Sequence, residues 1–139
     1  MKRDWDIYID VDGVLFFWNE NIHRLSLRNG IVEFLYYVTT NFKNCYWLSA
    51  WNDGFNSVLK KIYAVDIANK IKAKYYKHLK TENIDFTRNF LIIEDGLLDK
   101  EISVLKQNNC LKSYIQVPYN KDPDYLFKVI DIINSKIYK

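Results

Sequence analysis

Two aspartates separated by one residue, Asp10 and Asp12, follow an apolar segment and are themselves followed by Gly13. On an extended chain, residues two positions apart point to the same side, so the two carboxyl groups share a face. Gly13 allows the backbone to turn sharply and to approach a ligand closely. Two carboxylates at this spacing repel each other, and a hard cation such as magnesium relieves the repulsion. The pattern therefore indicates a site of phosphoryl-transfer chemistry.

Two later apolar segments also end in polar residues, one in Ser49 and the other in Glu94 and Asp95. The alternation of strand-like segments with helical periodicity predicts a parallel sheet. In open sheets of this kind, ligands bind beyond the carboxyl ends of the strands. Asp10, Ser49 and Asp95 all fall at predicted strand ends, so we expect them to lie at one edge of the sheet.

The three segments resemble, in type and order, motifs of the haloacid dehalogenase (HAD) phosphohydrolase superfamily, whose first motif reads Asp-x-Asp-Gly-(Val/Thr). The resemblance implies that Asp10 is the nucleophile and forms an aspartyl-phosphate, which divides one difficult displacement into two easier ones. It implies that Asp12 is the general acid and base, which protonates the leaving oxygen and later deprotonates the attacking water. Ser49 matches the residue that binds the phosphate in this family.

The family's fourth motif supplies metal ligands, and Glu94 and Asp95 match it. The resemblance implies that Mg²⁺ is the cofactor, held by Asp10, by the backbone carbonyl of Asp12 and by Asp95. Glu94 binds the ion either directly or through water. Asp99 fits a second acid that often follows this motif.

The third motif of the family is a lysine that offsets charge between the nucleophile and the phosphate. Five lysines precede the Glu94 segment: Lys70, Lys72, Lys74, Lys77 and Lys80. The family places this lysine just ahead of a helix, whose apolar face Tyr75, Tyr76 and Leu79 would form. This placement favours Lys72, with Lys74 next, and the remaining lysines are expected on a solvated helix face.

The segment from Trp47 to Asn52 and the short length of the chain resemble small HAD domains of RNA repair. Nucleotidases share the sequence motif Asp-Val-Asp-Gly-Val-Leu. Both resemblances imply a nucleic-acid end or a nucleotide as the phosphorylated partner. The residues expected to contact substrate are Gly13, Ala50, Trp51, Asn52 and Lys74. Trp18 or Trp51 could also stack on a base, although core packing is the preferred explanation for either aromatic. The net charge of +3 favours a polyanion only weakly.

Other functions stay open. One is a phosphate-binding or interaction module that has this fold and little turnover. The intact acids Asp10, Asp12 and Asp95 argue against this alternative. Another is a phosphatase of small metabolites, or an enzyme that transfers phosphoryl groups between metabolites. Dehalogenation needs a single nucleophilic aspartate and no magnesium site, so Asp12, Glu94 and Asp95 argue against it.

The chain has 139 residues, of which 49% are hydrophobic, enough for one core. We expect a single catalytic domain, residues 1–139, with an α/β, Rossmann-like (HAD-type) three-layer sandwich, a mainly parallel central sheet and no large cap domain. Strands are predicted near 7–10, 46–49, 90–93 and 114–117, and an irregular segment near 16–19. Helices are predicted near 31–38, 55–62, 97–105 and 123–133, with a lysine-rich helix before the strand at 90–93. In this family an open, capless site suits macromolecular phosphates.

No segment approaches the roughly 18 apolar residues that a membrane span needs. The N-terminus does not show a basic segment followed by an apolar one, the pattern of a secretory leader. We therefore expect a cytoplasmic protein without a membrane partner, and the sequence shows no obligate protein partner. Cys45 and Cys110 are too few and too far apart for a paired metal motif, so both are predicted to be buried free thiols. His23 and His78 are predicted to lie at the surface.

Overall fold

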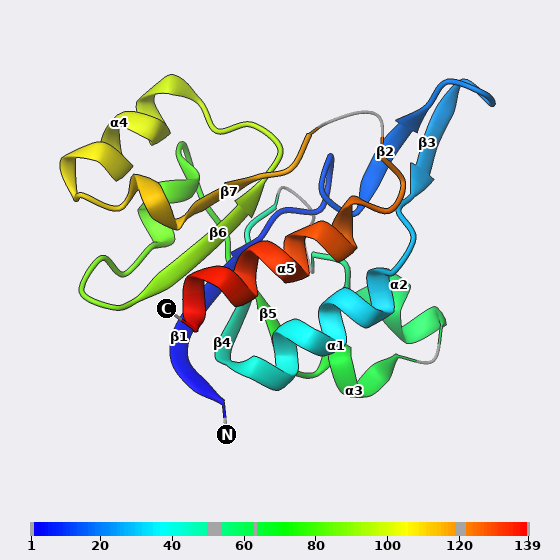
Figure 1. The fold of residues 1–139 in the computed structure, drawn as a ribbon, viewed down its shortest axis with the longest axis horizontal. Helices are drawn as coiled ribbons and strands as arrows, with labels where there is room; N and C mark the ends of the chain where they lie inside the picture. Colours follow the sequence, from blue (N-terminus) through cyan, green and yellow to red (C-terminus); the bar gives the residue numbers. More distant parts are fainter. Residues whose placement is uncertain (1, 50–53, 63, 119–121, 139) are drawn as a thin grey trace.

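The computed structural model describes residues 2–49, 54–62, 64–118 and 122–138. The chain forms an α/β fold around a five-stranded parallel sheet with the strand order β5-β4-β1-β6-β7 (Figure 1). The strands of this sheet are β1 (Arg3–Ile9), β4 (Phe42–Trp47), β5 (Ile71–Ala73), β6 (Phe90–Glu94) and β7 (Tyr114–Gln116). The parallel central sheet expected from the sequence is therefore confirmed.

Strand β1 occupies the centre of the sheet because it pairs with β4 on one side and with β6 on the other. The chain first adds strands outward from β1 to β5, and then crosses to the opposite side of β1 to form β6 and β7. The strand order therefore reverses between β1 and β6. In parallel α/β sheets this point is where a crevice opens beyond the carboxyl ends of the strands.

Side chains of β1 alternate between the two faces of the sheet, as the period of a strand requires. Ile7 and Ile9 belong to one buried hydrophobic cluster, and Tyr8 belongs to a second one. Strand β6 repeats the pattern, because Leu91 is in the first cluster and Ile92 is in the second. Both faces of the sheet are therefore covered.

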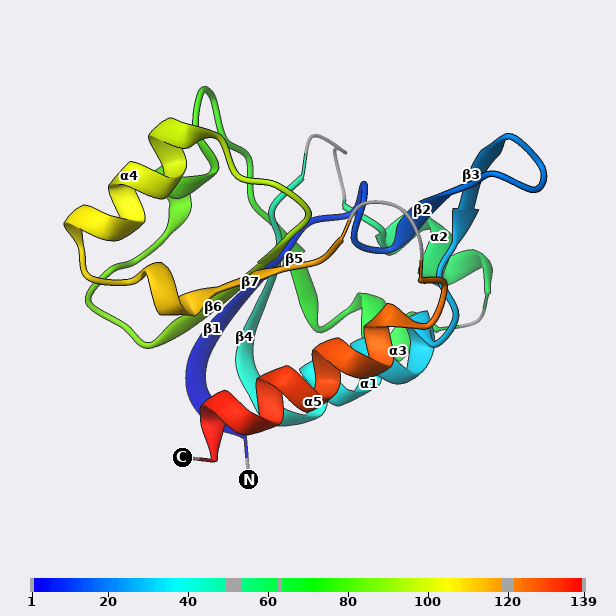
Figure 2. The same cartoon turned by 45° about the horizontal axis from the view of Figure 1, so that its top comes forward.

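The helices divide between these two faces (Figures 1 and 2). The first cluster is covered by α1 (Ile31–Asn41), α2 (Asn56–Lys61), α3 (Val65–Ala68) and α5 (Tyr125–Ile137). The second is covered by α4 (Asp99–Gln107) and the 3₁₀ helices η1 (Lys80–Asn83) and η2 (Leu111–Ser113). No helix in the described part of the chain combines the length and the apolar character that crossing a membrane requires.

A β-hairpin stands where the sequence predicts an irregular segment. Strands β2 (Phe16–Asn19) and β3 (Arg24–Leu27) pair antiparallel and form a separate two-stranded sheet. His23 in its turn has a positive φ of 50°. The backbone N–H of Arg28 donates to the Leu15 carbonyl at 2.8 Å and so closes the base of the hairpin. Each strand is too short for its alternation to stand out in the sequence, which is why the hairpin is missed.

The lysine-rich helix predicted before β6 does not form. Residues 71–73 are strand β5, and regular structure resumes only at η1. Lysines and apolar residues alternate from Lys70 to Lys74, and this period of two belongs to a strand. Ile71 is accordingly buried in the first cluster, while Lys72 is exposed.

Both cysteines are free thiols, but only Cys45 is buried, because Cys110 is partly exposed after α4. Burial raises the pKa of the Cys45 thiol to about 12. The surface positions expected for His23 and His78 are confirmed.

Candidate active site

Asp10 lies directly beyond the end of β1 and is buried, with 6% of its surface exposed. Its backbone N–H donates to the Ile93 carbonyl at 3.0 Å, which continues the pairing of β1 with β6 by one residue. The carboxyl group therefore sits at the point where the strand order reverses. Burial raises the pKa of Asp10, and the nearby charge of Lys80 opposes that effect.

Asp10, Glu94 and Asp95 form an acidic cluster at the ends of β1 and β6. Each contributes a carboxylate oxygen, and these oxygens lie within 4.8 Å of one another. Glu94 is the last residue of β6 and is only 2% exposed, and burial raises its pKa. Asp95 is more exposed, and its backbone N–H donates to Glu94 Oε1 at 3.2 Å. This edge of the sheet thus gathers the hard oxygen donors that the sequence predicts there.

Lys80 supplies a positive charge to the acidic cluster. Its Nζ lies 3.3 Å from Asp10 Oδ1 and forms an ion pair with Glu94 Oε2. Burial alone would lower the pKa of Lys80, but the two carboxylates outweigh burial and raise it. The side chain therefore stays protonated and offsets part of the repulsion between Asp10 and Glu94.

Glu101 of α4 holds the backbone that carries Lys80. Its Oε2 accepts a hydrogen bond from the Lys80 backbone N–H at 2.6 Å, and its Oε1 accepts one from Leu98 at 2.9 Å. Glu101 is itself only 3% exposed. One buried carboxylate thus joins the start of η1 to the start of α4 and positions Lys80 next to Asp10.

Gly13 allows the loop after β1 to approach Asp95. Its φ is +78°, in the left-handed region that side chains disfavour, and a Cβ at this position would overlap Oδ2 of Asp95. The close approach expected of Gly13 is therefore made toward a carboxylate of the acidic cluster.

Arg28 is a residue of this region that the sequence does not single out. It is 2% exposed, and its guanidinium donates to the carbonyls of Gly13 (3.2 Å), Pro118 (2.7 Å) and Asp122. Among the described residues, no hydrogen-bond partner reaches its Nε. Burial lowers the pKa of Arg28, although the negative charge of Asp122 opposes this effect. Arg28 thus ties the loop after β1 to the segment between β7 and α5.

The other predicted site residues fall in different places. Asp12 is exposed on the loop after β1, and Ser49 is buried two residues after β4. The residue before Ser49, Leu48, donates from its backbone N–H to Ile9 at 2.9 Å, so Ser49 lies at the same edge of the sheet as Asp10. Ala50, Trp51, Asn52 and Asp53 lie outside the described residues.

Lys72 does not take the position that the sequence favours for the third-motif lysine. It is exposed on β5, opposite Tyr46 of β4. Lys74 donates from its backbone to Trp47 at 2.9 Å, and its Nζ lies 4.6 Å from the centre of the Tyr46 ring. The physical reason is that this segment is extended rather than helical, so the lysine that reaches Asp10 comes later in the chain, at Lys80. Asp99 begins α4 outside the acidic cluster.

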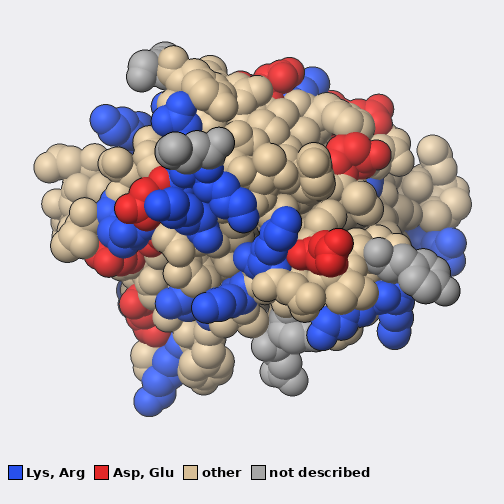
Figure 3. Space-filling model, turned by 90° about the horizontal axis from the view of Figure 1, so that it is seen from below, with Lys and Arg blue, Asp and Glu red and all other residues tan. Residues whose placement is uncertain are grey.

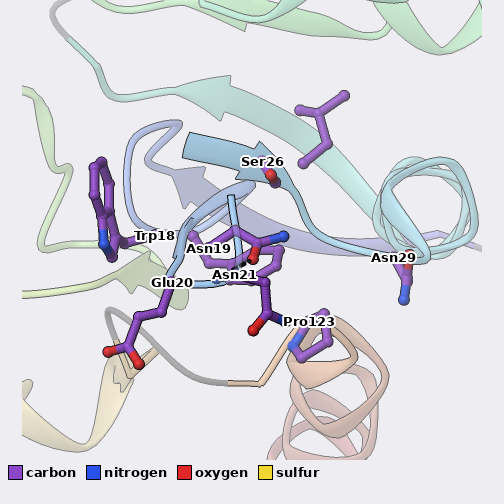
Figure 4. A pocket seen from close by; sticks show the side chains of 9 residues that line it. Trp18, Asn19, Glu20, Asn21, Ser26, Asn29 and Pro123 are labelled. Carbon is purple, nitrogen blue, oxygen red and sulfur yellow. Dashed lines mark hydrogen bonds between the residues drawn. The ribbon is translucent and has the colours of Figure 1, made fainter. Parts of the chain in front are cut away.

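Two cavities of the described part of the chain have linings that do not include Asp10, Glu94 or Asp95. The hairpin cavity, about 460 Å³, lies between the β2–β3 hairpin and the start of α5 (Figure 4). The second, about 710 Å³, includes Arg88, Lys112 and Lys136 in its lining. Figure 3 views the side at which both chain ends lie in Figure 1, and Lys and Arg side chains gather on this face. Because β1 begins at this side, the basic face is not the surface around the acidic cluster.

No protein-family model matches the chain, and no curated protein matches it either. The functional argument therefore depends on the geometry of the site. Three carboxylates within reach of one ion form a set of hard oxygen donors, which suits Mg²⁺, Mn²⁺ or Ca²⁺. An ammonium group that contacts one of these carboxylates can also bind an anionic substrate.

Proposed function

We propose that the chain is a magnesium-dependent phosphomonoesterase of the HAD type, with a Rossmann-like catalytic fold, acting on a nucleotide or a nucleic-acid end. The observation that carries the proposal is the convergence of Asp10, Glu94 and Asp95 with Lys80 at the ends of β1 and β6. The position of this convergence also supports it, because the strand order reverses there.

The donor set favours Asp10 and Asp95 as metal ligands. The family resemblance adds the backbone carbonyl of Asp12. Both carboxylate oxygens of Glu94 already have partners, one in Lys80 and the other in the Asp95 backbone. Glu94 would therefore act mainly by holding Lys80. The bound ion would neutralise phosphate charge, which is the usual contribution of magnesium to phosphoryl transfer.

The chemical steps of this proposal are those that the family resemblance implies for Asp10 and Asp12. A carboxylate oxygen of Asp10 attacks phosphorus, an oxygen–phosphorus bond forms, and the bond to the leaving oxygen breaks. Asp12 gives its proton to that leaving oxygen. Water then attacks the aspartyl-phosphate, Asp12 takes a proton from the water, and cleavage of the bond to Asp10 releases phosphate.

Lys80 fits the charge-offsetting role better than the other lysines of its segment. Its protonated Nζ contacts the proposed nucleophile, where it lowers the cost of bringing an anionic phosphate to a carboxylate. The same contact favours the ionised form of Asp10, which is the form that attacks.

The proposal is tested by phosphate release from a small aryl phosphate, with magnesium and with a chelator. We expect release only with magnesium, and its loss in an Asp10→Asn variant whose circular dichroism matches the wild type. Asp99→Asn, which removes an exposed acid outside the cluster, is the control and should retain activity. Undiminished turnover by Asp10→Asn would show that Asp10 is not the nucleophile.

A further inference from the structure

We infer that the hairpin cavity binds the nucleoside part of the substrate, so that the phosphate esters recognised are mononucleotides or the terminal nucleotides of a nucleic acid. This inference rests on the proposed function, because the acidic cluster would hold the phosphate. It concerns a separate surface, formed by the β2–β3 hairpin and the start of the segment that leads into α5.

The hairpin cavity has a size and a lining suited to a small organic group. Its volume of about 460 Å³ lies within the range of roughly 300–1,000 Å³ typical of small-molecule sites. Its lining residues are Phe17, Trp18, Asn19, Glu20, Asn21, Ser26, Leu27, Asn29 and Pro123. Figure 4 shows Asn19 and Asn21 between Trp18 and Glu20 on one side and Pro123 and Asn29 on the other. The lining therefore combines apolar surface with side-chain amide groups.

The cavity lies at the same edge of the sheet as the acidic cluster. Arg28 provides the connection, because it donates to Gly13 beside Asp95 and also to the Asp122 carbonyl beside Pro123. The next residue, Asn29, donates from its backbone to the Pro123 carbonyl at 2.8 Å. Figure 2 shows the hairpin and the segment that leads into α5 next to each other at this end of the molecule. Arg28 and Asn29 thus connect the loop beside the acidic cluster to the wall of the hairpin cavity.

The polar groups of the lining match the edge of a nucleobase. Asn21 and Ser26 make no side-chain hydrogen bond to another described residue. Asn19 Oδ1 accepts a hydrogen bond from the Asn21 backbone at 3.0 Å, and no described residue accepts from the Asn19 side-chain amide. Asparagine amides pair with base edges through one donor and one acceptor, and an exposed tryptophan such as Trp18 offers a stacking surface.

The charge of the lining selects against a second phosphate. Among the described residues that line the cavity, Glu20 is the one that carries a charge. Glu20 would repel a negative group, and no lysine or arginine of the described lining would offset this repulsion. An uncharged heteroaromatic group fits better, and its exocyclic amine can donate to a carboxylate, as cytosine does.

The test compares the four nucleoside 3′- and 5′-monophosphates, end-phosphorylated oligonucleotides and a small aryl phosphate as substrates. We expect kcat/KM for at least one nucleotide substrate to exceed that for the aryl ester by about 10-fold or more, the size of effect that stacking one base supplies. The oligonucleotide arm shows whether the nucleoside comes from a free nucleotide or from a nucleic-acid end.

Variants then locate the effect. Trp18→Ala and Asn21→Ala should raise KM for the preferred nucleotide, Trp18→Ala by about 10-fold, and leave hydrolysis of the aryl ester unchanged. The matched control is Ile22→Ala, which removes an exposed apolar side chain from the same hairpin but not from the cavity lining. An equal loss on both substrates, or an equal effect of Ile22→Ala, would overturn the inference.

Failure of the inference and failure of the proposed function give different results. Hydrolysis of the aryl ester without any preference for nucleotides would overturn the inferred nucleoside site but support the proposed phosphatase activity. Absence of all hydrolysis would overturn the proposed phosphatase activity. Isothermal titration calorimetry with unphosphorylated nucleosides would then test whether the hairpin cavity binds a nucleoside. Binding that Trp18→Ala weakens would uphold the nucleoside site, and no binding at millimolar nucleoside would overturn it.

Discussion

Nζ of Lys80 lies 3.3 Å from Oδ1 of Asp10, although the two residues are far apart in the sequence. The contact is possible because Asp10 directly follows the central strand β1 and Lys80 begins the 3₁₀ helix η1. The same ammonium group pairs with Glu94, so one cation serves two buried carboxylates.

Replacing Lys80 by methionine should therefore affect both activity and stability. The substitution leaves Asp10 and Glu94 buried without their cation, and removal of one partner from a buried ion pair costs about 3 kcal/mol of unfolding free energy. We expect phosphate release to fall by about 100-fold or more, the scale of a lost electrostatic contact to the reacting groups. Urea denaturation and steady-state kinetics measure the two effects. Lys72→Met is the control, and a comparable loss there would restore Lys72 as the functional lysine.

Gly13→Ala should distort the acidic cluster. The added methyl group would overlap Asp95 Oδ2, and alanine at a φ of +78° is strained by about 1–2 kcal/mol. We expect lower stability and a higher magnesium concentration for half-maximal activity. Gly96→Ala is a matched control, because a Cβ there meets no atom within 4 Å. If the two variants behaved alike, the contact between Gly13 and Asp95 would not matter for the metal.

Magnesium should stabilise the folded protein through Asp95. A ligand that binds only the native state at 100 times its dissociation constant adds about 2.7 kcal/mol of unfolding free energy. We expect magnesium to raise the melting temperature of the wild type, and Asp95→Asn to remove most of this shift. Asp99→Asn should keep the shift, since Asp99 lies outside the cluster. Differential scanning fluorimetry measures this without any substrate, and an unchanged shift in Asp95→Asn would contradict the assignment.

The two thiols should differ in reactivity toward iodoacetamide. Cys45 is buried and its pKa is raised to about 12, whereas Cys110 is partly exposed. Peptide mass spectrometry should find Cys110 alkylated and Cys45 protected until denaturant is added. The raised pKa of Cys45 should also lower the free energy of unfolding at high pH. Above about pH 9 the thiol ionises in the unfolded chain but not in the folded one, which favours the unfolded chain. Cys45→Ala should reduce this loss between pH 9 and 12, and an identical pH profile would argue against a buried thiol.

Local patterns predict the parts of the site that lie at strand ends. Asp10, Glu94 and Asp95 each end an apolar segment, and parallel strands bring their carboxyl ends to one edge, so their proximity follows from the sequence. The correct lysine does not follow, because five lysines occupy the same segment and only the packing of η1 against α4 distinguishes Lys80. Arg28 is missed for a similar reason. An arginine becomes a buried contact between loops only through the tertiary structure.

The central position of β1 also has a consequence for the order of folding. Its two neighbours come from distant parts of the chain, β4 on one side and β6 on the other. Pairings of such different sequence separation differ in loop-closure cost, so the nearer pair can form before the farther one. The carboxylate of Asp10 meets Lys80 and Glu94 only when the segment from η1 to β6 packs beside β1. The structure therefore couples the burial of Asp10 to the arrival of its cation, because the segment that completes the sheet also carries Lys80.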